Sequence, residues 1–462
     1  MLNMVIYGFI VFLILVTAAF LIQAFRKSQK LILYLLFSEA FFLYGFIYWF
    51  DLPGSLKYLI FFVLLIGYLA TVNNRYTDNK ITKLLFAFLI IVVFFSLLLE
   101  SVSFNLVQSL AGLIFLFLPI VLFSNIDWTD GLIVESIRIF YFIFIIQLII
   151  ATYQSFILRL PFDYISGSLG RAETTTISIL GTFIFSIGLG FGVFYKKKKI
   201  FIFSIVTAVY FFSIAEAKAG FFAISSSVLV LIILRSGEGT SLIKLFLFFV
   251  GSLIISYVSF FYLMPQFLGN YLGSDIFSSA DRLFDYFGKN YSDRDVRFTS
   301  LINVFFDFLN KPMNFWMGKG LGYFSESTLA GKSAIDPSLL YFYSMAPESV
   351  IYLINIGVLG TSLFISLHLY FIYYGLKVFQ STKEIKIKFA SYVSINSLIL
   401  MLISFLTYSR PFRSNVLTFF TYGAFGLVIY YKRNNLAKIL LPPKTGAKKF
   451  ILRVEREFPK VT

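Results

Sequence analysis

Charged side chains are scarce in this sequence, and the few that interrupt its apolar stretches are the first candidates for chemistry. Charged residues make up 13% of the 462-residue chain and apolar residues 59%. A charge beside lipid is costly, so a charge placed there often lines a cavity or a binding site. The candidates are Glu348, Arg297, Arg171, Lys218, Arg294, Arg410, Arg413, Glu173 and Glu216.

The six cations in this set suit a phosphate-bearing ligand. Arginine presents a planar fork that makes two parallel hydrogen bonds to a phosphate group. A preorganised group of cations can also stabilise the charge on a leaving pyrophosphate. Hydroxyl groups follow Arg171 at Thr174 to Thr176, which suits a sugar phosphate. Together these residue types favour a lipid pyrophosphate.

Each of these positions also has an ordinary structural explanation. Arg171 and Glu173 can anchor the end of a helix at the membrane surface. Lys218, beside Glu216 in "AEAKAG" (215–220), can reach water from a simple turn. Because that turn interrupts almost continuous apolar sequence, we favour a cavity there.

The two arginine pairs later in the chain have similar alternatives. In "DRDVRFTS" (293–300), Arg294 can pair with a neighbouring aspartate, whereas Arg297 lies closer to the apolar side and is the better functional candidate. Arg410 and Arg413, in "YSRPFRSN" (408–415), can be ordinary interfacial arginines.

Glu348 is the carboxylate best suited to act as a base. It follows Pro347 in "YSMAPESVIYLINIGVLG" (343–360), and proline fits the first position of a helix. The carboxylate then lies in the first turn, where the helix dipole favours a negative charge. Dipole complementation alone would explain this placement. The functional alternative is a carboxylate at a cavity mouth, acting as a general base or a hydrogen-bond acceptor.

The elements that must position these residues are membrane-spanning helices. Mean hydropathy is +0.85, and the apolar runs reach the roughly 20 residues that cross a bilayer as a helix. The sequence therefore predicts an all-α polytopic membrane protein with about thirteen spans, within a range of twelve to fourteen. Their predicted cores are 4–25, 31–50, 56–73, 84–100, 105–124, 131–157, 177–195, 200–215, 219–234, 243–264, 347–376, 389–408 and 415–431.

Alternation of charge between the loops predicts the topology. The loops at 26–30, 74–83, 196–199, 235–244 and 377–388 are rich in Lys and Arg, as cytoplasmic loops are. The loop 125–131 falls on that side without a basic residue.

The predicted organisation has four parts. Residues 1–264 form ten spans with short outer loops near 158–176 and 216–220, and 265–346 form one large outer loop. Residues 347–431 form three spans, and 432–462 form a basic cytoplasmic tail. All nine candidate charges then belong to the outer side.

Composition narrows the chemistry further. The chain has no cysteine and one histidine, His368, inside an apolar run, so thiolate and histidine-based metal centres are not expected. We expect neither a metal nor another cofactor. The net charge of +16 is explained by cytoplasmic Lys and Arg, so no nucleic-acid partner is expected.

The large outer loop contains its own structural signals. Ser278 to Gly288 begins and ends like a helix, and 292–312 predicts an amphipathic helix. Its apolar positions are 298, 301, 302, 305, 308 and 309, and Pro312 follows its end. "MGKGLGYF" (317–324) lacks the spacing of a nucleotide-binding loop, so we interpret it as a tight return after the helix.

Three of these motifs resemble the O-antigen ligase/polymerase superfamily. "RFTSLINVFFDFLNKPMNFWMGKGLGYF" (297–324) is similar to its signature loop, and "APESVIYLINIGVLG" (346–360) to its next helix. "EAKAG" (216–220) resembles its Ser-Arg-Gly turn, with Lys218 in place of the arginine. The resemblance covers roughly 165–365 and includes Arg171, where the family has an arginine in an outer loop.

The resemblance implies a helical bundle similar to other lipid-linked glycosyltransferases, with a large periplasmic loop over the site. It implies metal-free transfer of a glycan from an undecaprenyl-pyrophosphate donor to an acceptor, at the periplasmic face of the bacterial inner membrane. Arg171, Lys218 and Arg297 would bind the pyrophosphate, and Glu348 would activate or orient the acceptor hydroxyl as a general base. Arg410 and Arg413 would be secondary contacts. Membrane lipids are implied as partners, and a chain-length regulator is left open.

Departures from the family pattern favour a Wzy-type O-antigen polymerase. Ligases have a histidine after the glycine-rich turn, where this chain has Pro347 and Glu348. The polymerase pattern Arg-x10-Gly is matched one residue short, by Arg171 and Gly181. An O-antigen ligase that attaches polysaccharide to lipid A core remains an alternative. A polysaccharide flippase is a third, although such transporters usually lack a large structured outer loop.

Overall fold

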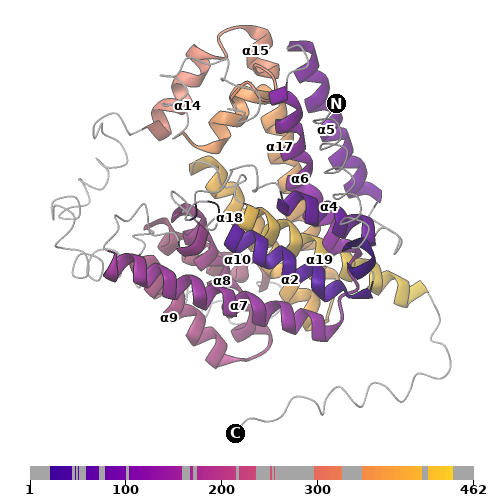
Figure 1. Ribbon diagram of the computed structural model, residues 1–462, viewed down its shortest axis with the longest axis vertical. Coiled ribbons are helices and arrows are strands. Elements are labelled where there is room, and N and C mark those ends of the chain that lie inside the picture. The colour runs from indigo at the N-terminus through magenta and orange to yellow at the C-terminus, as the bar shows by residue number, and fades with distance from the viewer. Residues whose placement is uncertain are drawn as a thin grey trace, which may run out of the picture.

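In the computed structural model, the regular secondary structure of the described residues is entirely helical (Figure 1). These are residues 21–25, 27–43, 47, 50, 59–71, 79–99, 104–158, 167–169, 174–214, 218–235, 250–251, 254, 296–324, 346–407 and 415–440. Within these ranges no residue is in a β-strand. The predicted all-α class is therefore confirmed.

Helices occupy most of the segments that the sequence predicted as spans. The predicted core 105–124, for example, corresponds to a helix from Phe104 to Asn125. The elements are α2 (Gln29–Ser38), η1 (Glu39–Leu43), α4 (Leu59–Thr71), α5 (Asn79–Leu99), α6 (Phe104–Asn125), α7 (Asp130–Thr152), η4 (Tyr153–Ile157), η6 (Gly167–Leu169), α8 (Thr174–Phe194), α9 (Lys198–Ile214), α10 (Lys218–Arg235), α14 (Val296–Asp307), α15 (Pro312–Met317), α17 (Glu348–Ser381), α18 (Ile385–Thr407) and α19 (Asn415–Leu440).

Five helices in the described ranges are long and apolar enough to cross a membrane. They are Lys80–Leu99, Leu106–Asn125, Asp130–Ile157, Glu348–Ser381 and Ile385–Leu406. The protein thus has the character of an α-helical membrane protein. The count of thirteen spans and the periplasmic position of the large loop remain predictions.

Helix α18 lies at the centre of the bundle. In the apolar stretch of α18 that could span a membrane, 72% of the residues are buried. In the corresponding stretch of Asp130–Ile157, only 22% are buried. Helix α18 packs against α17, α19, α8 and α10. Peripheral helices instead leave large apolar side chains uncovered, such as Phe86 of α5 and Phe142 of α7. This pattern fits a bundle whose outer surface faces lipid.

Polar side chains join three helices inside the apolar core. The amide of Asn396 on α18 donates hydrogen bonds to the hydroxyls of Ser186 on α8 and Ser227 on α10. All three residues are fully or almost fully buried. Such interhelical hydrogen bonds hold helices together where lipid gives no hydrophobic driving force for association.

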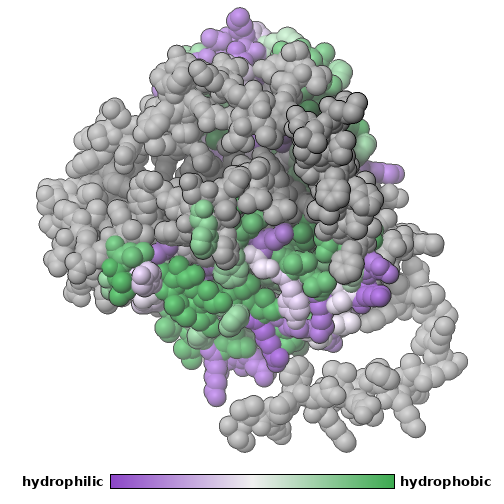
Figure 2. All heavy atoms as spheres, in the orientation of Figure 1, coloured by the Kyte–Doolittle hydropathy of each residue, from purple (hydrophilic) through white to green (hydrophobic). Residues whose placement is uncertain are grey.

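One end of the bundle gathers loops that the sequence places in the cytoplasm. Lys386 at the start of α18 pairs with Asp130 of α7 at 3.3 Å, and Lys30 pairs with Glu135 at 2.7 Å. The backbone amide of Asp127 donates to the side chain of Gln29 at 2.9 Å. The loop 125–131 therefore lies with the basic loops, although it has no basic residue. Figure 2 shows hydrophilic residues below the hydrophobic face of the lower helices.

The opposite end contains the described part of the large loop. Figure 1 shows α14 and α15 beside the N-terminal part of α17, against which both helices pack. Helix α14 is shorter than the predicted 292–312, because the chain turns after Asp307 and a new helix starts at Pro312. Val304 of this helix and Phe308 just after it are buried, whereas Ile302 and Phe305 are exposed. The predicted apolar face was therefore only partly right.

Candidate functional site

Helix α17 is broken at Gly357, which has φ 66° and ψ −172°. The rings of Tyr352 and Phe364 lie 4.7 Å apart across this break. Twelve residues of straight helix would separate the two positions by about 18 Å along the axis. The segment 348–356, called here the half-helix, therefore makes a sharp angle with the rest of α17 and faces it. Broken helices at membrane depth are found where they line binding sites.

The glycine-rich loop fills the break. An intact helix would use the carbonyls of Ile354 and Asn355 for its own hydrogen bonds. Here the backbone amides of Lys319 and Gly320 donate to these carbonyls, at 2.7 and 3.0 Å. We call this arrangement the glycine clasp.

Two glycines make the clasp possible. A Cβ atom on Gly318 would lie 2.5 Å from the backbone nitrogen of Gly357, and a Cβ on Gly357 would clash with the backbone of Gly318 in turn. Gly318, Gly320 and Gly322 all have positive φ angles. The interpretation of this loop as a tight return with unusual backbone angles is confirmed.

The loop also contacts α5 and the half-helix beyond the clasp. The amide of Leu321 donates to the Ser96 hydroxyl of α5, and the amide of Phe324 donates to the Asn355 side chain, both at 3.0 Å. The backbone donors at 319–321 and 324 are thus used to hold helices together. They do not form a phosphate cradle.

Glu348 is the first residue of the half-helix and is only 1% exposed. Its predicted place in the first turn is confirmed. Pro347 lies one position earlier than predicted, as the N-cap, with φ −52° and ψ 146°. Ala346 and Ser349 are buried as well, so this helix N-terminus lies inside the protein.

Tyr352 lies one turn after Glu348, on the same face of the half-helix. Its ring contacts Phe364 and also Phe405 of α18, at a centroid distance of 5.1 Å. This face of the half-helix is therefore directed at the later part of α17 and at the C-terminal part of α18.

Tyr422 of α19 lies against the later part of α17. Its hydroxyl is hydrogen-bonded to Nε2 of His368, and Nδ1 of His368 lies 2.8 Å from the Phe364 carbonyl oxygen. Both Tyr422 and His368 are fully buried.

These hydrogen bonds have a fixed direction. A carbonyl oxygen can only accept, so Nδ1 of His368 carries a proton and donates it to Phe364. In the neutral ring Nε2 is then an acceptor, and Tyr422 must donate to it. Tyr422 donates its single hydroxyl hydrogen to His368, so in any further hydrogen bond its oxygen can act only as an acceptor.

An aromatic shell surrounds His368. The ring centroids of Phe364, Phe371 and Phe117 lie 4.3, 5.9 and 6.4 Å from its own. The prediction that the only histidine is buried inside a span agrees with this structure. Its connection to the half-helix was missed, because only the break at Gly357 brings Tyr352 against Phe364, which lies beside His368.

The predicted cations are placed only in part. Arg297 is the second residue of α14, and Lys218 is the first residue of α10; nothing is described of their side chains. The positions that lie outside the described residues are Arg171, Glu173, Glu216, Arg294, Arg410 and Arg413. The cation cluster therefore stays a prediction.

Glu39 is a further carboxylate inside a predicted span, and sequence reasoning missed it. It begins the π-helical turn η1, and one of its carboxylate oxygens is buried without a hydrogen-bond partner. The turn packs against η6, whose Gly167 exchanges two hydrogen bonds with the Gln154 side chain: its carbonyl accepts from Nε2 at 2.8 Å, and its amide donates to Oε1 at 2.9 Å. The sequence does contain a signal for this residue, because Glu39 is the single glutamate in the apolar run 31–50.

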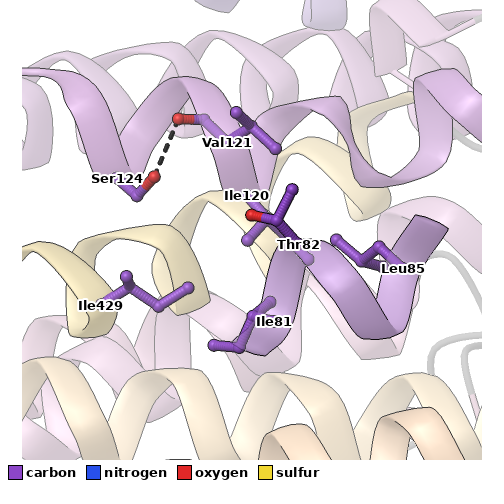
Figure 3. A pocket seen from close by; sticks show the side chains of 7 residues that line it. All are labelled: Ile81, Thr82, Leu85, Ile120, Val121, Ser124 and Ile429. Carbon is purple, nitrogen blue, oxygen red and sulfur yellow. Dashed lines mark hydrogen bonds between the residues drawn. The ribbon is translucent and has the colours of Figure 1, made fainter. Parts of the chain in front are cut away.

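A small cleft lies where the start of α5, the end of α6 and α19 meet (Figure 3). It is lined mainly by aliphatic side chains, including Ile81, Leu85, Ile120 and Ile429. The Ser124 hydroxyl at its edge donates to the Val121 carbonyl at 2.9 Å. This cleft is remote from Glu348 and offers little chemistry.

The described residues contain no group of three or more His, Cys, Asp and Glu side chains that could hold a metal ion. Comparison of the sequence with protein-family models and with curated proteins gave no match. The resemblance to the O-antigen ligase/polymerase superfamily therefore rests on the motifs themselves and stays a prediction.

Proposed function

We propose that this protein is a glycosyltransferase that polymerises undecaprenyl-pyrophosphate-linked oligosaccharide repeat units at the periplasmic face of the bacterial inner membrane. The observation that carries the proposal is the buried Glu348 at the start of a half-helix, with Tyr352 one turn later on the same face. A carboxylate held away from water among polar groups is suited to proton transfer.

The reaction joins two lipid-linked substrates. A hydroxyl on the non-reducing sugar of a new unit attacks the anomeric carbon of the growing chain, and Glu348 takes the proton of that hydroxyl. The bond from the anomeric carbon to the lipid pyrophosphate breaks, so the substrate itself supplies the energy.

The departing pyrophosphate needs positive charge. The proposal assigns this role to Arg171, Lys218 and Arg297, with Arg410 and Arg413 as further phosphate or glycan contacts. Arginine side chains suit this role because they bind phosphate through two parallel hydrogen bonds. Glu173 and Glu216 would orient these cations or contact the glycan.

Replacement of the arginines tests the assignment in cells. We expect Arg297→Ala and Arg171→Ala each to abolish long polysaccharide chains, because the leaving pyrophosphate loses a cation. Chain length is measured on gels, and membrane content of the protein by immunoblot. Arg433→Ala, in the basic tail beside Tyr430, is the matched control and should leave chain length unchanged. Normal chain lengths in both arginine variants would remove the assignment.

A further inference from the structure

One side of α14 is apolar and yet uncovered. Val304, on its inner side, belongs to the same buried cluster as Val350 and Ile354 of the half-helix. Ile302 and Phe306 lie one turn apart on the opposite side and are 61% and 72% exposed. A helix that packs on a protein in water normally turns polar residues outward. Helix α14 therefore has two apolar sides, and the bundle covers only one of them.

Helix α15 continues the exposed apolar surface. Met313 and Trp316 lie three positions apart on one side of this short helix, and both are exposed. The ring of Phe315 joins the two helices, because its centroid lies 6.0 Å from that of Phe305 and 5.0 Å from that of Trp316. An exposed apolar patch that extends over two elements marks a surface that binds protein or membrane. This surface, called here the α14–α15 face, consists of Ile302, Phe305, Phe306, Met313 and Trp316.

The neighbouring helix α5 shows how far the membrane reaches. It is one of the helices long and apolar enough to cross a bilayer. Near its end, the Ser96 hydroxyl accepts a hydrogen bond from the amide of Leu321, in the loop that follows α15. At the same level, on the other side of α5, Phe94 and Leu98 are exposed. Exposed apolar side chains of a spanning helix face lipid, so the bilayer extends to the level of the glycine-rich loop.

The residue types around the α14–α15 face point to lipid as its occupant. The exposed polar residues Asp307, Asn310 and Lys311 lie together at the turn between the two helices. The face itself contains no charged residue and includes a tryptophan. Tryptophan is enriched where hydrocarbon meets headgroups, and a lysine at that depth can extend to the lipid phosphates. An apolar helix face bounded by polar residues is the pattern of a helix that lies in the membrane surface.

We propose that α14 and α15 form a membrane-surface anchor, with the α14–α15 face buried in the lipid leaflet at this end of the bundle. The occupant is the acyl-chain region just below the lipid headgroups. Because the other side of α14 packs on the half-helix, the anchor fixes the depth of the half-helix, and of Glu348 at its start, relative to the membrane. This role holds whether or not the protein is a glycosyltransferase.

Spin labels report directly which medium covers the face, and single-cysteine variants are simple to make because the chain has no cysteine. Phe306→Cys and Trp316→Cys carry the label in the full-length protein, in vesicles of phosphatidylethanolamine and phosphatidylglycerol. Power-saturation EPR compares collisions with oxygen, which concentrates in lipid, and with a nickel chelate, which stays in water. Phe142→Cys, on the exposed side of α7, is the lipid control, and Lys311→Cys is the water control.

Both labels on the α14–α15 face should match Phe142→Cys, with oxygen accessibility above that of the nickel chelate, and Lys311→Cys should show the reverse. All four side chains are exposed, so the label displaces no packed group. Nickel accessibility equal to that of Lys311→Cys would place the face in water and overturn the proposal. Low accessibility to both reagents would also overturn it, because another segment of the chain or a second copy then covers the face. Neither measurement uses turnover, so failure here is distinct from failure of the proposed function.

Discussion

Glu348 illustrates what a single residue gains from its surroundings. In the sequence it is one carboxylate after a proline, and dipole complementation is enough to explain it. In the structure it is buried at the start of the half-helix, with Tyr352 on the same face. Simple dipole complementation requires no such burial, since an exposed carboxylate also interacts favourably with the helix dipole.

The sequence could predict the position of Glu348 but not the packing around the half-helix. That position follows from a local signal, the proline and the start of an apolar helix. Tyr422 lies 54 positions after its partner His368, in another helix, and no local pattern marks a contact of that range. His368 could be placed inside a span by hydropathy, but hydropathy does not show which helix face meets which neighbour.

At the scale of elements, the central feature is the clasp between the glycine loop and the half-helix. The loop could be predicted as a tight return, because glycines at alternate positions indicate unusual backbone angles. The break in α17 could not, because "INIGVLG" (354–360) fits a continuous apolar helix. The break exists because Gly318 and Gly357 meet backbone to backbone.

Gly357→Ala tests the clasp. Alanine at φ 66° is strained, and its Cβ atom would collide with the backbone around Gly318. We therefore expect the free energy of unfolding to fall by about 2–4 kcal/mol. The measurement is the thermal midpoint of the detergent-purified protein. Gly112→Ala in α6 is the matched control, since a Cβ atom there meets nothing within 4 Å. Equal melting of the two variants would contradict the clasp.

At the scale of the whole molecule, the bundle separates a basic end from the end that holds Glu348. The ion pairs of Lys386 with Asp130 and of Lys30 with Glu135 lie at the first end. The clasp and α14 lie at the other. Charge alternation along the sequence could predict this separation, because each span reverses the side of the next loop. The angle between the two parts of α17 could not be predicted in this way.

The absence of cysteine makes the orientation directly measurable. Lys311→Cys, between α14 and α15, and Lys383→Cys, between α17 and α18, introduce single exposed thiols at the two ends. We expect a membrane-impermeant maleimide to label Lys311→Cys in cells with a permeabilised outer membrane. Lys383→Cys should react only after the inner membrane is opened. The reverse pattern would contradict a periplasmic site.

The most direct test of the central claim is polymerisation in vitro by the purified protein, with a defined undecaprenyl-pyrophosphate-linked repeat unit as the only substrate. The account predicts long chains from the wild type, with and without a chelator, and a loss of turnover of about 10²-fold or more in Glu348→Gln. Glu384→Gln, at the basic end, should match the wild type. Full turnover by Glu348→Gln would contradict the role of Glu348 as the base.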